Sequence, residues 1–411
     1  MTKALGLGVL AGFAAMSAEA GENSSLLKKL VEKGVITEGE AAVLAEEANN
    51  EWNDAAALPS WVNSMTLKGD LRLRAEQKQN GEAGGYTGNR PARYRFRYRF
   101  RFGGTADLGN GWKAGFRLAS GGTNPNSTNT TMDDHQQNDA IYIDQAYASW
   151  SGNGFTVYGG KMPSQDKTGF KFSKAILDGD ITPEGLQVHY NDIEFGSTTV
   201  GINTGVWIQD ENKDDSNDEY LYLYQIASST SLSDTMKLDL AWGGYTSQGG
   251  QFDDTIHSDN AGNDSGENFS ISSLDAALSI KQGPGVKLYG SLIENHAADT
   301  AADGLLYGVK FGSAKKAGQW EAGIEYRELE ANSVYDDYSD SDFGAYGTGS
   351  SAGKYYNGTD AEGIVIKAKY NLADNTQLAF AWFRTENNDA DGSAESTTEN
   401  DRIQADIVFK F

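Results

Sequence analysis

The sequence predicts an all-β protein: a transmembrane antiparallel up-and-down β-barrel of about 16 strands, preceded by a short α-helical hairpin. Three observations lead to this fold class. Runs of about ten residues alternate between apolar and polar side chains, the connections between the runs are short and long in turn, and the last run ends in phenylalanine. Alternation of period two puts the two kinds of side chain on opposite faces of a strand, and a barrel between lipid and water needs that division.

The first twenty residues have the layout of a secretory signal peptide. Lys3 precedes an apolar run from Ala4 to Met16, and Ala18-Glu19-Ala20 follows as a cleavage motif of small residues. The apolar run is too short to span a bilayer. We therefore expect residues 1–20 to be removed by cleavage near Ala20.

Residues 21–61 are expected to form a periplasmic helical hairpin and a linker. Gly34 stands where a glycine commonly ends a helix, and Thr37 followed by Glu40 has the spacing of a capping box that opens a second helix. The hairpin is too short to be stable as an isolated domain. The barrel is expected to occupy residues 62–411.

Composition excludes several alternatives. The chain has no cysteine and a formal net charge of −24. An exported chain without cysteine cannot rely on disulfides, and so large an excess of acid argues against nucleic acid as a partner. No later stretch approaches the eighteen consecutive apolar residues of a transmembrane helix.

The barrel strands are predicted from runs of alternating side chains. The runs are 66–76, 92–105, 111–120, 139–151, 154–162, 184–192, 197–210, 219–231, 236–247, 269–282, 286–296, 304–314, 319–330, 360–371, 377–387 and 400–411. Short connections such as SGNG, SDTM and GPG alternate with long ones, namely 77–91, 121–138, 163–183, 211–218, 248–268, 297–303, 331–359 and 388–399. The fold of a soluble sandwich does not require every second connection to be short. An outer-membrane barrel has tight turns on its periplasmic side and longer loops on its external side, so its connections alternate in length.

The second run, RYRFRYRFRF (93–102), alternates five arginines with five aromatic residues. Its arginines would face water in a soluble sandwich and the lumen in a membrane barrel, and a basic segment can also bind nucleic acid or a membrane surface. A charge on the lipid face would cost about 2–4 kcal/mol at mid-membrane, so the barrel requires the arginines to face inward. Two belts of tryptophan are expected at the membrane interfaces, formed by Trp112, Trp150 and Trp320 near short turns and by Trp207, Trp242 and Trp382 near long loops.

The last five residues, Ile407-Val408-Phe409-Lys410-Phe411, resemble the final strand of bacterial outer-membrane β-barrels. In that family the terminal aromatic is read by the barrel assembly machinery, a role that falls here on Phe409 and Phe411. The signal peptide, the sixteen runs and the long third gap resemble the sixteen-stranded trimeric porins, especially those with a short N-terminal helical segment. The resemblance implies a homotrimer in outer-membrane lipid and lipopolysaccharide, passive diffusion of small hydrophilic solutes, and a third loop (163–183) folded into the lumen. The hairpin more weakly resembles terminal oligomerisation hairpins, and it is a candidate tether to peptidoglycan.

The charge pattern predicts which residues line the pore. The acidic side is expected from the third loop and its end, namely Asp166, Asp178, Asp180 and Glu184. The basic wall is expected from Arg72, Arg74, Arg93, Arg95, Arg97, Arg99, Arg101, Arg117 and Lys161. Opposed charges across a narrow lumen create a transverse field, and the arginines favour entry of anions. The alternative is that these charges only pair with one another and stiffen the barrel.

Other functions find less support. The acidic stretches 210–219 and 336–342 lack the glycine and the distant glutamate of a calcium loop, so they predict solubilising external loops, and we expect no metal or other cofactor. The four histidines are dispersed and no hydrolase motif is present, which argues against an enzyme and predicts His189 as a hydrogen-bonded lumen residue. A structural or adhesive barrel with a plugged lumen stays open as an alternative.

Overall fold

The computed structural model describes residues 29–35, 37–41, 43–44, 62–80, 92–211, 213, 218–249, 269–346, 355–388 and 399–411. The chain divides into two compact units, Met1–Ser64 and Met65–Phe411. The predicted signal peptide lies outside the described residues. Within those residues, no helix is both long enough and apolar enough to cross a membrane.

The N-terminal unit contains short helical segments joined by the predicted capping residues. The amides of Gly34 and Val35 donate to carbonyls of the helical segment 29–32 at 2.9 and 3.0 Å, and Gly34 has a φ of +68°, which together form a Schellman motif. The Thr37 amide donates to Glu40 Oε2 at 2.8 Å, and the Glu40 amide donates back to Thr37 Oγ1 at 3.2 Å. The capping box and the helix-ending glycine predicted from the sequence are confirmed.

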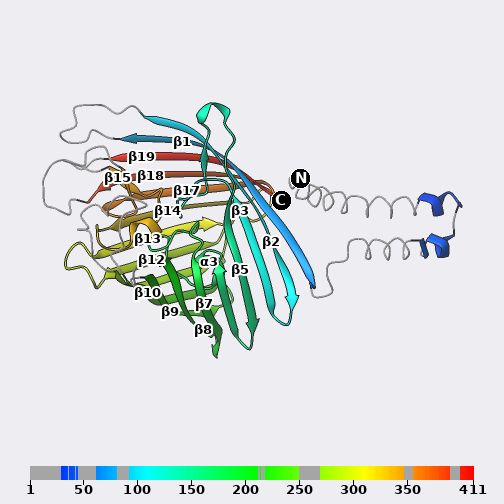
Figure 1. Cartoon of the computed structure of the whole chain (residues 1–411), viewed down its shortest axis with the longest axis horizontal. Helices are drawn as coiled ribbons and strands as arrows, with labels where there is room; N and C mark the ends of the chain where they lie inside the picture. The colour runs from blue at the N-terminus through cyan, green and yellow to red at the C-terminus, as the bar shows by residue number, and fades with distance from the viewer. Residues whose placement is uncertain are drawn as a thin grey trace. The chain divides into compact units, whose positions relative to one another are not determined.

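The second unit is a closed antiparallel barrel (Figure 1). In the described part of the chain, its sixteen strands are β1 (Ser64–Asn80), β2 (Arg93–Gly109), β3 (Trp112–Ala119), β5 (Tyr142–Gly152), β6 (Phe155–Lys161), β7 (Glu184–Phe195), β8 (Thr198–Asp210), β9 (Glu219–Ser233), β10 (Met236–Gln248), β11 (Ser270–Ile280), β12 (Val286–Asn295), β13 (Asp303–Gly312), β14 (Trp320–Leu329), β17 (Ala361–Ala373), β18 (Thr376–Asn387) and β19 (Asn400–Lys410). Each strand pairs with its neighbours in sequence, and β1 closes the barrel by pairing with both β2 and β19. The predicted sixteen-stranded up-and-down barrel is confirmed.

In the described parts of the connections lie three shorter strands and three short helical turns. They are β4 (Thr130–Thr131), which pairs with β2, the hairpin of β15 (Gly344–Tyr346) and β16 (Tyr355–Asn357), η1 (Asp134–Gln136), η2 (Asp336–Tyr338) and α3 (Gln165–Thr168). The third loop, residues 163–183, holds α3. The seventh loop, residues 331–359, holds η2 and the hairpin.

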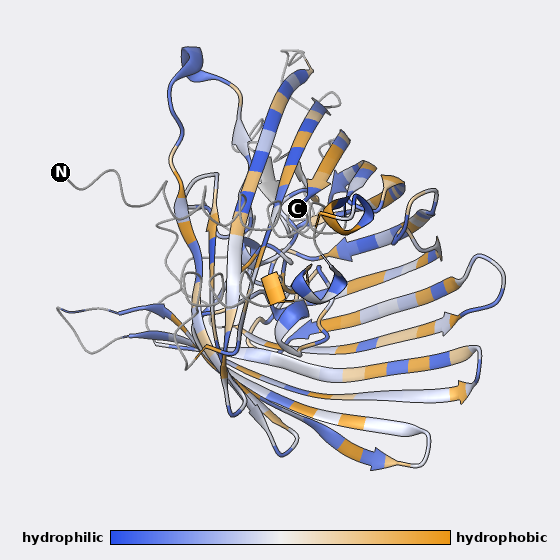
Figure 2. Ribbon diagram, turned by 90° about the vertical axis from the view of Figure 1, so that its right-hand side faces the viewer, coloured by the Kyte–Doolittle hydropathy of each residue, from blue (hydrophilic) through white to orange (hydrophobic). Residues whose placement is uncertain are grey.

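The strands have the two faces that the alternating pattern predicts (Figure 2). Along β2, Tyr94 and Phe96 are 70% and 64% exposed on the outer face, whereas Arg99 on the inner face is 8% exposed. Large apolar side chains such as Leu292 and Phe380 are exposed on other strands as well. Exposed apolar side chains are stable on this outer wall because lipid, and not water, surrounds it.

One tryptophan assignment is wrong. Trp207 was expected in an interfacial belt, but it is 1% exposed and its ring lies 6.2 Å from that of Tyr338 in the seventh loop. The reason is its position in β8, where it shares the inner face with Asn203 and Gly205. Trp242 by contrast is 51% exposed on the outer face of β10.

A hydrophobic core fills part of the barrel interior. It joins the third loop, the seventh loop and the inner wall, through Met162, Phe170, Phe172, Ala175, Ile176, Leu177, Ile181, Trp207, Leu221, Leu223, Tyr245, Phe269, Ile271, Ile293, Leu306, Leu329 and Val334. On β8 to β14 these wall residues lie in the strand halves next to the long loops. The two loops therefore cover the apolar part of the inner wall and exclude water from it.

The acidic stretch 336–342 is also not the external solubilising loop that the sequence predicted. Asp336, Asp337 and Asp340 are only 5–7% exposed, and they belong to the part of the seventh loop that folds inward. The physical reason is the cationic inner wall, which offers Asp340 and Asp342 of this stretch cationic partners that solvent does not.

We predict that Trp207→Ala destabilises the barrel far more than Trp242→Ala. Truncating a large buried side chain leaves a cavity and typically costs about 3–5 kcal/mol, whereas a lipid-facing side chain leaves none. The measurement is the thermal unfolding midpoint of each detergent-solubilised variant. Equal losses in the two variants would contradict the inward position of Trp207.

Candidate functional site: the charged lumen

The basic wall on β1 and β2 is paired with acids from the same part of the wall. Asp70 accepts from Arg99 Nη2 and Arg101 Nε, each at 2.8 Å. Asp406 on β19 accepts from Arg74 Nε and Nη2 at 2.7 and 2.8 Å. Two parallel hydrogen bonds of this kind form the strongest class of ion pair, so the arginines are held in fixed orientations.

The other predicted basic residues have varied partners. Arg95 pairs with Glu76 at 2.5 Å, Arg72 lies 3.9 Å from Asp406 and hydrogen-bonds Asn129, and Arg97 donates to the carbonyl oxygen of Asn129 at 3.3 Å. Arg117 pairs with Asp144 on β5, and Lys161 pairs with Glu184 at 2.8 Å. Arg93 lies exposed at the start of β2. Asp70, Glu76, Asp144 and Asp406 were not in the predicted pore-lining set. Alternation places Asp70, Glu76 and Asp406 on the inner face, whereas Asp144 lies at a register shift between β3 and β5 that breaks the alternation.

Of the four predicted acidic residues, Asp180 alone is paired with the β2 arginines in the described structure. Its Oδ1 lies 3.3 Å from Arg101 Nη1 and 3.9 Å from Arg99 Nη1. Asp166 pairs with its neighbour Lys167 at 2.6 Å, and Glu184 pairs with Lys161 across adjacent strands. The amide of Asp178 donates to the carbonyl of Tyr338 at 2.6 Å, so this residue joins the third loop to the seventh.

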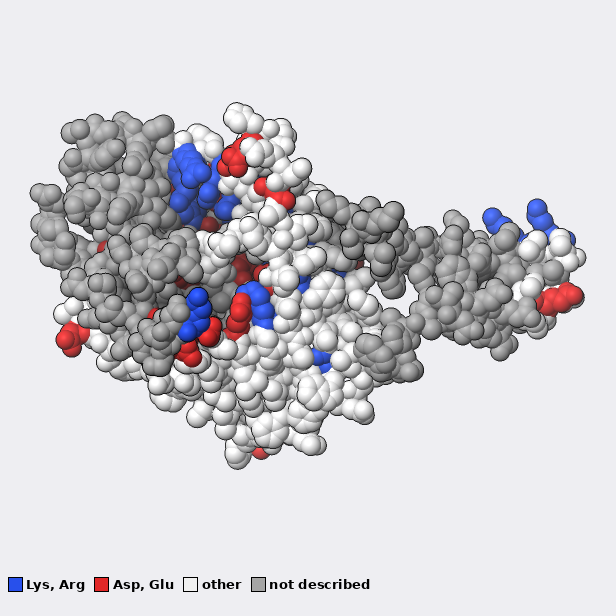
Figure 3. Space-filling view, viewed as in Figure 1, with Lys and Arg blue, Asp and Glu red and all other residues white. Residues whose placement is uncertain are grey.

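The seventh loop supplies acids that the sequence did not reveal. Asp342 pairs with Arg402 at 2.6 Å and with Arg74 at 3.5 Å. Asp340 lies 3.5 Å from Arg327 and 3.8 Å from Lys367. These contacts join positions that are 13 to 268 residues apart in the chain, and most of them leave no local signal. Figure 3 shows cationic and anionic side chains gathered together, while the lower outer wall is almost free of charge.

The loop carboxyl groups respond differently to this environment. Burial would raise the pKa of Asp180, but Arg99 and Arg101 hold that pKa below its ordinary value. Burial opposes ionisation of Asp342 too, and Arg402 and Arg74 lower its pKa. Burial and the nearby carboxylate of Asp340 raise the pKa of Asp178 to about 7. Asp178 is therefore the loop acid that titrates near neutral pH.

His189 has the structural role that the sequence predicts. It is fully buried on the inner face of β7, with Nδ1 2.9 Å from Asn203 Oδ1 and Nε2 3.2 Å from Gln187 Oε1. A Cβ on Gly169 of the third loop would lie 2.6 Å from its Nδ1, so only glycine allows the loop to approach this closely. Within the described ranges, no three His, Cys, Asp or Glu side chains are grouped to hold a metal ion.

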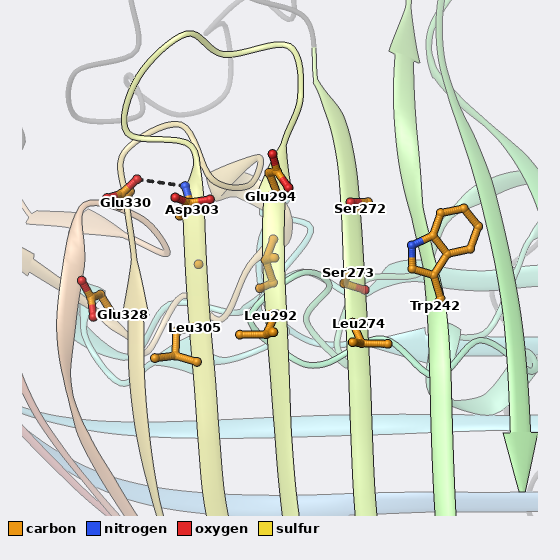
Figure 4. Close-up of a pocket in the computed structure, with 12 residues that line it drawn as sticks. Trp242, Ser272, Ser273, Leu274, Leu292, Glu294, Asp303, Leu305, Glu328 and Glu330 are labelled. Atoms are coloured by element: carbon orange, nitrogen blue, oxygen red, sulfur yellow. Dashed lines mark hydrogen bonds between the residues drawn. The ribbon is translucent and has the colours of Figure 1, made fainter.

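A hollow of about 550 Å³ also lies on the outer wall (Figure 4). Leu274, Leu292 and Leu305 form its apolar part, and Asp303 and Glu330 lie beyond them toward the loop end. Leu274 and Leu292 are more than half exposed on the outside of the barrel, so this hollow faces the membrane and is separate from the lumen.

The closed barrel, its apolar outer wall and its charged interior define an outer-membrane channel-type β-barrel. The chain matches the family described as "Putative porin" over residues 25–87, 77–267 and 287–411, and it belongs to that family. A search of curated proteins finds no match. Family and fold together support an outer-membrane location and a channel role.

Solved structures match the chain at low sequence identity, and the first of them shows the same fold. The high-pH structure of Pseudomonas putida OprB is 9% identical, with a TM-score of 0.55 over 89% of this chain and 96% of that one. A mutant Rh. blastica porin is 13% identical, with a TM-score of 0.45 over 85% of this chain and 100% of that one. A loop L8 deletion mutant of Vibrio cholerae OmpT is 14% identical, with a TM-score of 0.47 over the same shares.

We predict that docking of the seventh loop on the third weakens as pH rises toward 7. The pKa of Asp178 is raised above its ordinary value of 3.8 to about 7, so the stability of the docked loops is complete below about pH 4 and falls until about pH 7. Ionised Asp178 then repels Asp340. Hydrogen exchange of amides 334–338, corrected for intrinsic rates, should show easier opening at pH 8 than at pH 5.

The Asp178→Asn variant should lose this pH dependence. Asp166→Asn is the matched control, because Asp166 lies in the same loop but is paired on its surface with Lys167. If Asp178→Asn keeps the wild-type dependence, another group is responsible.

Proposed function

We propose that the protein is a porin for passive diffusion of small hydrophilic solutes, with a lumen narrowed by the third loop, residues 163–183, and by the arginines of β1 and β2. The contact of Asp180 with Arg99 and Arg101 carries this proposal, because it brings an acid of an inward-folded loop against the wall arginines. A loop held there narrows the passage. Side-chain ion pairs hold it against β2.

An anion preference is supported by the arginines that lack a full ion pair. Arg97 has no carboxylate partner among the described residues, and the nearest carboxylate oxygen to Arg72 is 3.9 Å away. An arginine stays charged in any such environment, so each adds positive potential to the lumen. Paired arginines such as Arg74 add little.

We predict that Arg97→Gln shifts ion selectivity toward cations. The measurement is the zero-current potential of single channels in planar bilayers under a salt gradient. Arg384→Gln is the matched control, since Arg384 is exposed on the outer face of β18 and pairs there with Glu399 at 2.8 Å. No shift in Arg97→Gln would place that side chain outside the narrow region, and the absence of discrete conductance steps in the wild type would overturn the open-pore function.

We further propose the route by which the chain reaches the membrane. Export is followed by cleavage near Ala20, and the periplasmic hairpin of residues 21–61 tethers the barrel of residues 62–411 to peptidoglycan. The barrel assembles as a homotrimer in lipid and lipopolysaccharide. The barrel assembly machinery recognises Phe409 and Phe411 at the end of the chain.

The assembly role of Phe411 is supported by its place where the barrel closes. Gly69 and Phe411 exchange backbone hydrogen bonds of 2.6 and 3.1 Å, and the ring of Phe411 stacks on Phe100 at 6.4 Å. A Cβ on Gly69 would meet that ring at 2.4 Å. The aromatic ring therefore covers the β1–β19 junction from outside.

We predict that Phe411→Ala lowers the amount of folded barrel in the outer membrane several-fold. Phe311→Ala is the matched control, because Phe311 is also exposed on the outer wall next to a short turn, but lies on β13. The measurement is heat-modifiable electrophoretic mobility of outer-membrane fractions. Equal yields of the two variants would argue against a terminal assembly signal.

A structural or adhesive barrel is the second candidate. It is favoured by the hydrophobic core that the third and seventh loops form inside the barrel, which reduces the open cross-section. The conductance measurement separates the two functions.

A further inference from the structure

A cavity of about 510 Å³ lies inside the barrel between the third loop and the inner wall of β7 to β13. Lys171 and Phe172 line it from the loop, and Lys237, Lys287 and Tyr289 line it from β10 and β12. Lys237 and Lys287 each follow directly after a short turn. The cavity thus lies on the short-turn side of the hydrophobic core.

One lysine of this cavity faces a like charge across the sheet. Lys287 on β12 stands directly opposite Lys310 on β13, and like charges in that position destabilise a sheet. Lys310 is compensated by Glu321 at 3.1 Å, but Lys287 has no carboxylate partner in the described structure. Lys171 also lacks one there. Lys310, Lys237 and Lys171 add to the positive field at Lys287, and Asp239 opposes it.

The acids that line the cavity already have partners, and the first of them, Asp166, pairs with Lys167 at 2.6 Å. Asp239 accepts from Lys237 at 3.0 Å and from Ser229 at 2.7 Å. Asp275 accepts from Ser273 Oγ at 2.8 Å. Ammonium groups are therefore the unsatisfied charged groups that the cavity offers, and they match an anion that can accept several hydrogen bonds.

The rest of the lining is apolar. Phe172 stacks on Phe170 with ring centroids 5.4 Å apart, and Tyr289 and Leu306 extend the apolar surface along the wall. A fully hydrated inorganic anion gains nothing from these groups, whereas an organic anion buries its hydrocarbon part against them. The combination favours a ligand with one anionic end and one apolar end.

We propose that this cavity is a binding site for small organic carboxylates on their way through the channel. The carboxylate lies between Lys171 and Lys287, and the apolar part of the solute packs on Phe172 and Tyr289. The inference rests on the proposed diffusion function and names a class of solute for it. It also accounts for the Lys287–Lys310 pair, since a bound anion relieves their repulsion.

The test is inhibition of the potassium chloride current by benzoate in planar bilayers. Benzoate should reduce the current through the wild-type channel at lower concentration than phosphate or phenylalanine. Lys287→Gln and Lys171→Gln should each raise the half-inhibiting concentration about fivefold, the loss expected for one partly exposed charge-assisted hydrogen bond. Lys113→Gln, on the inner face of β3 and outside the cavity, is the matched control and should leave benzoate inhibition unchanged.

Each other result overturns the inference. Equal inhibition by phosphate indicates a general anion effect, and equal inhibition by phenylalanine indicates a zwitterion site. An effect of Lys113→Gln as large as that of Lys287→Gln indicates lumen charge alone. If conductance steps are present without benzoate inhibition, the carboxylate site is wrong and the porin function stands, whereas absent steps overturn the porin function. Calorimetric titration of the detergent-solubilised protein with benzoate tests the carboxylate site independently of conductance. If no benzoate binding is measured, the proposed site is rejected.

Discussion

The neutralisation of inward-facing arginines is the constraint on which the interior of this barrel depends. An arginine cannot escape a costly position by losing its proton, so each buried guanidinium must find an acid or a carbonyl. Neighbouring strands supply some partners, as Asp406 does for Arg74. For Arg402, which is 2% exposed, the partner is Asp342 of the seventh loop. The charge of the wall thus favours the inward position of the seventh loop, which ion pairs join to the barrel.

Apolar packing adds to the ion pairs in holding the third and seventh loops inside the barrel. Once Asp180 and Asp342 bring the third and seventh loops to the wall, residues such as Ile176 and Val334 bury against inner positions of β8 to β14. Burial of this apolar surface stabilises the inward position of the loops, since its stabilisation grows with the area removed from water. It also explains why inner positions such as Leu223 are apolar, in a face that a simple water-filled barrel would keep polar.

The sequence was sufficient to predict the barrel, but it was insufficient to predict which loops fold into the barrel and which ion pairs they form there. Strand alternation and loop length are local signals, and they predicted all sixteen strands and the two faces of residues 93–102. Alternation also predicts Trp207 on the inner face, because it has the same parity as Asn203 and Gly205, whereas nearness to a long loop alone predicts an interfacial belt. Pairs such as Asp342 with Arg402 depend on the closed fold, and an acid-rich segment has the same composition whether it is solvated or paired. That is why the seventh loop was assigned to the outside.

The distinction between paired and unpaired cations changes how the basic lumen should be understood. Arg99 and Arg101 share Asp70 and Asp180, so together these four groups carry no net charge and act mainly as a strut between loop and wall. A passing solute responds to the net field, which comes from cations without such partners. A count of arginines therefore overstates the attraction at the wall. The lysines near the short turns are fewer, yet Lys287 has no carboxylate within ion-pair distance among the described residues, and ammonium groups on flexible stems can exchange partners as a solute moves. In the proposed function, anions are therefore attracted by the cations without full ion pairs, while the paired Arg99 and Arg101 hold the third loop in place.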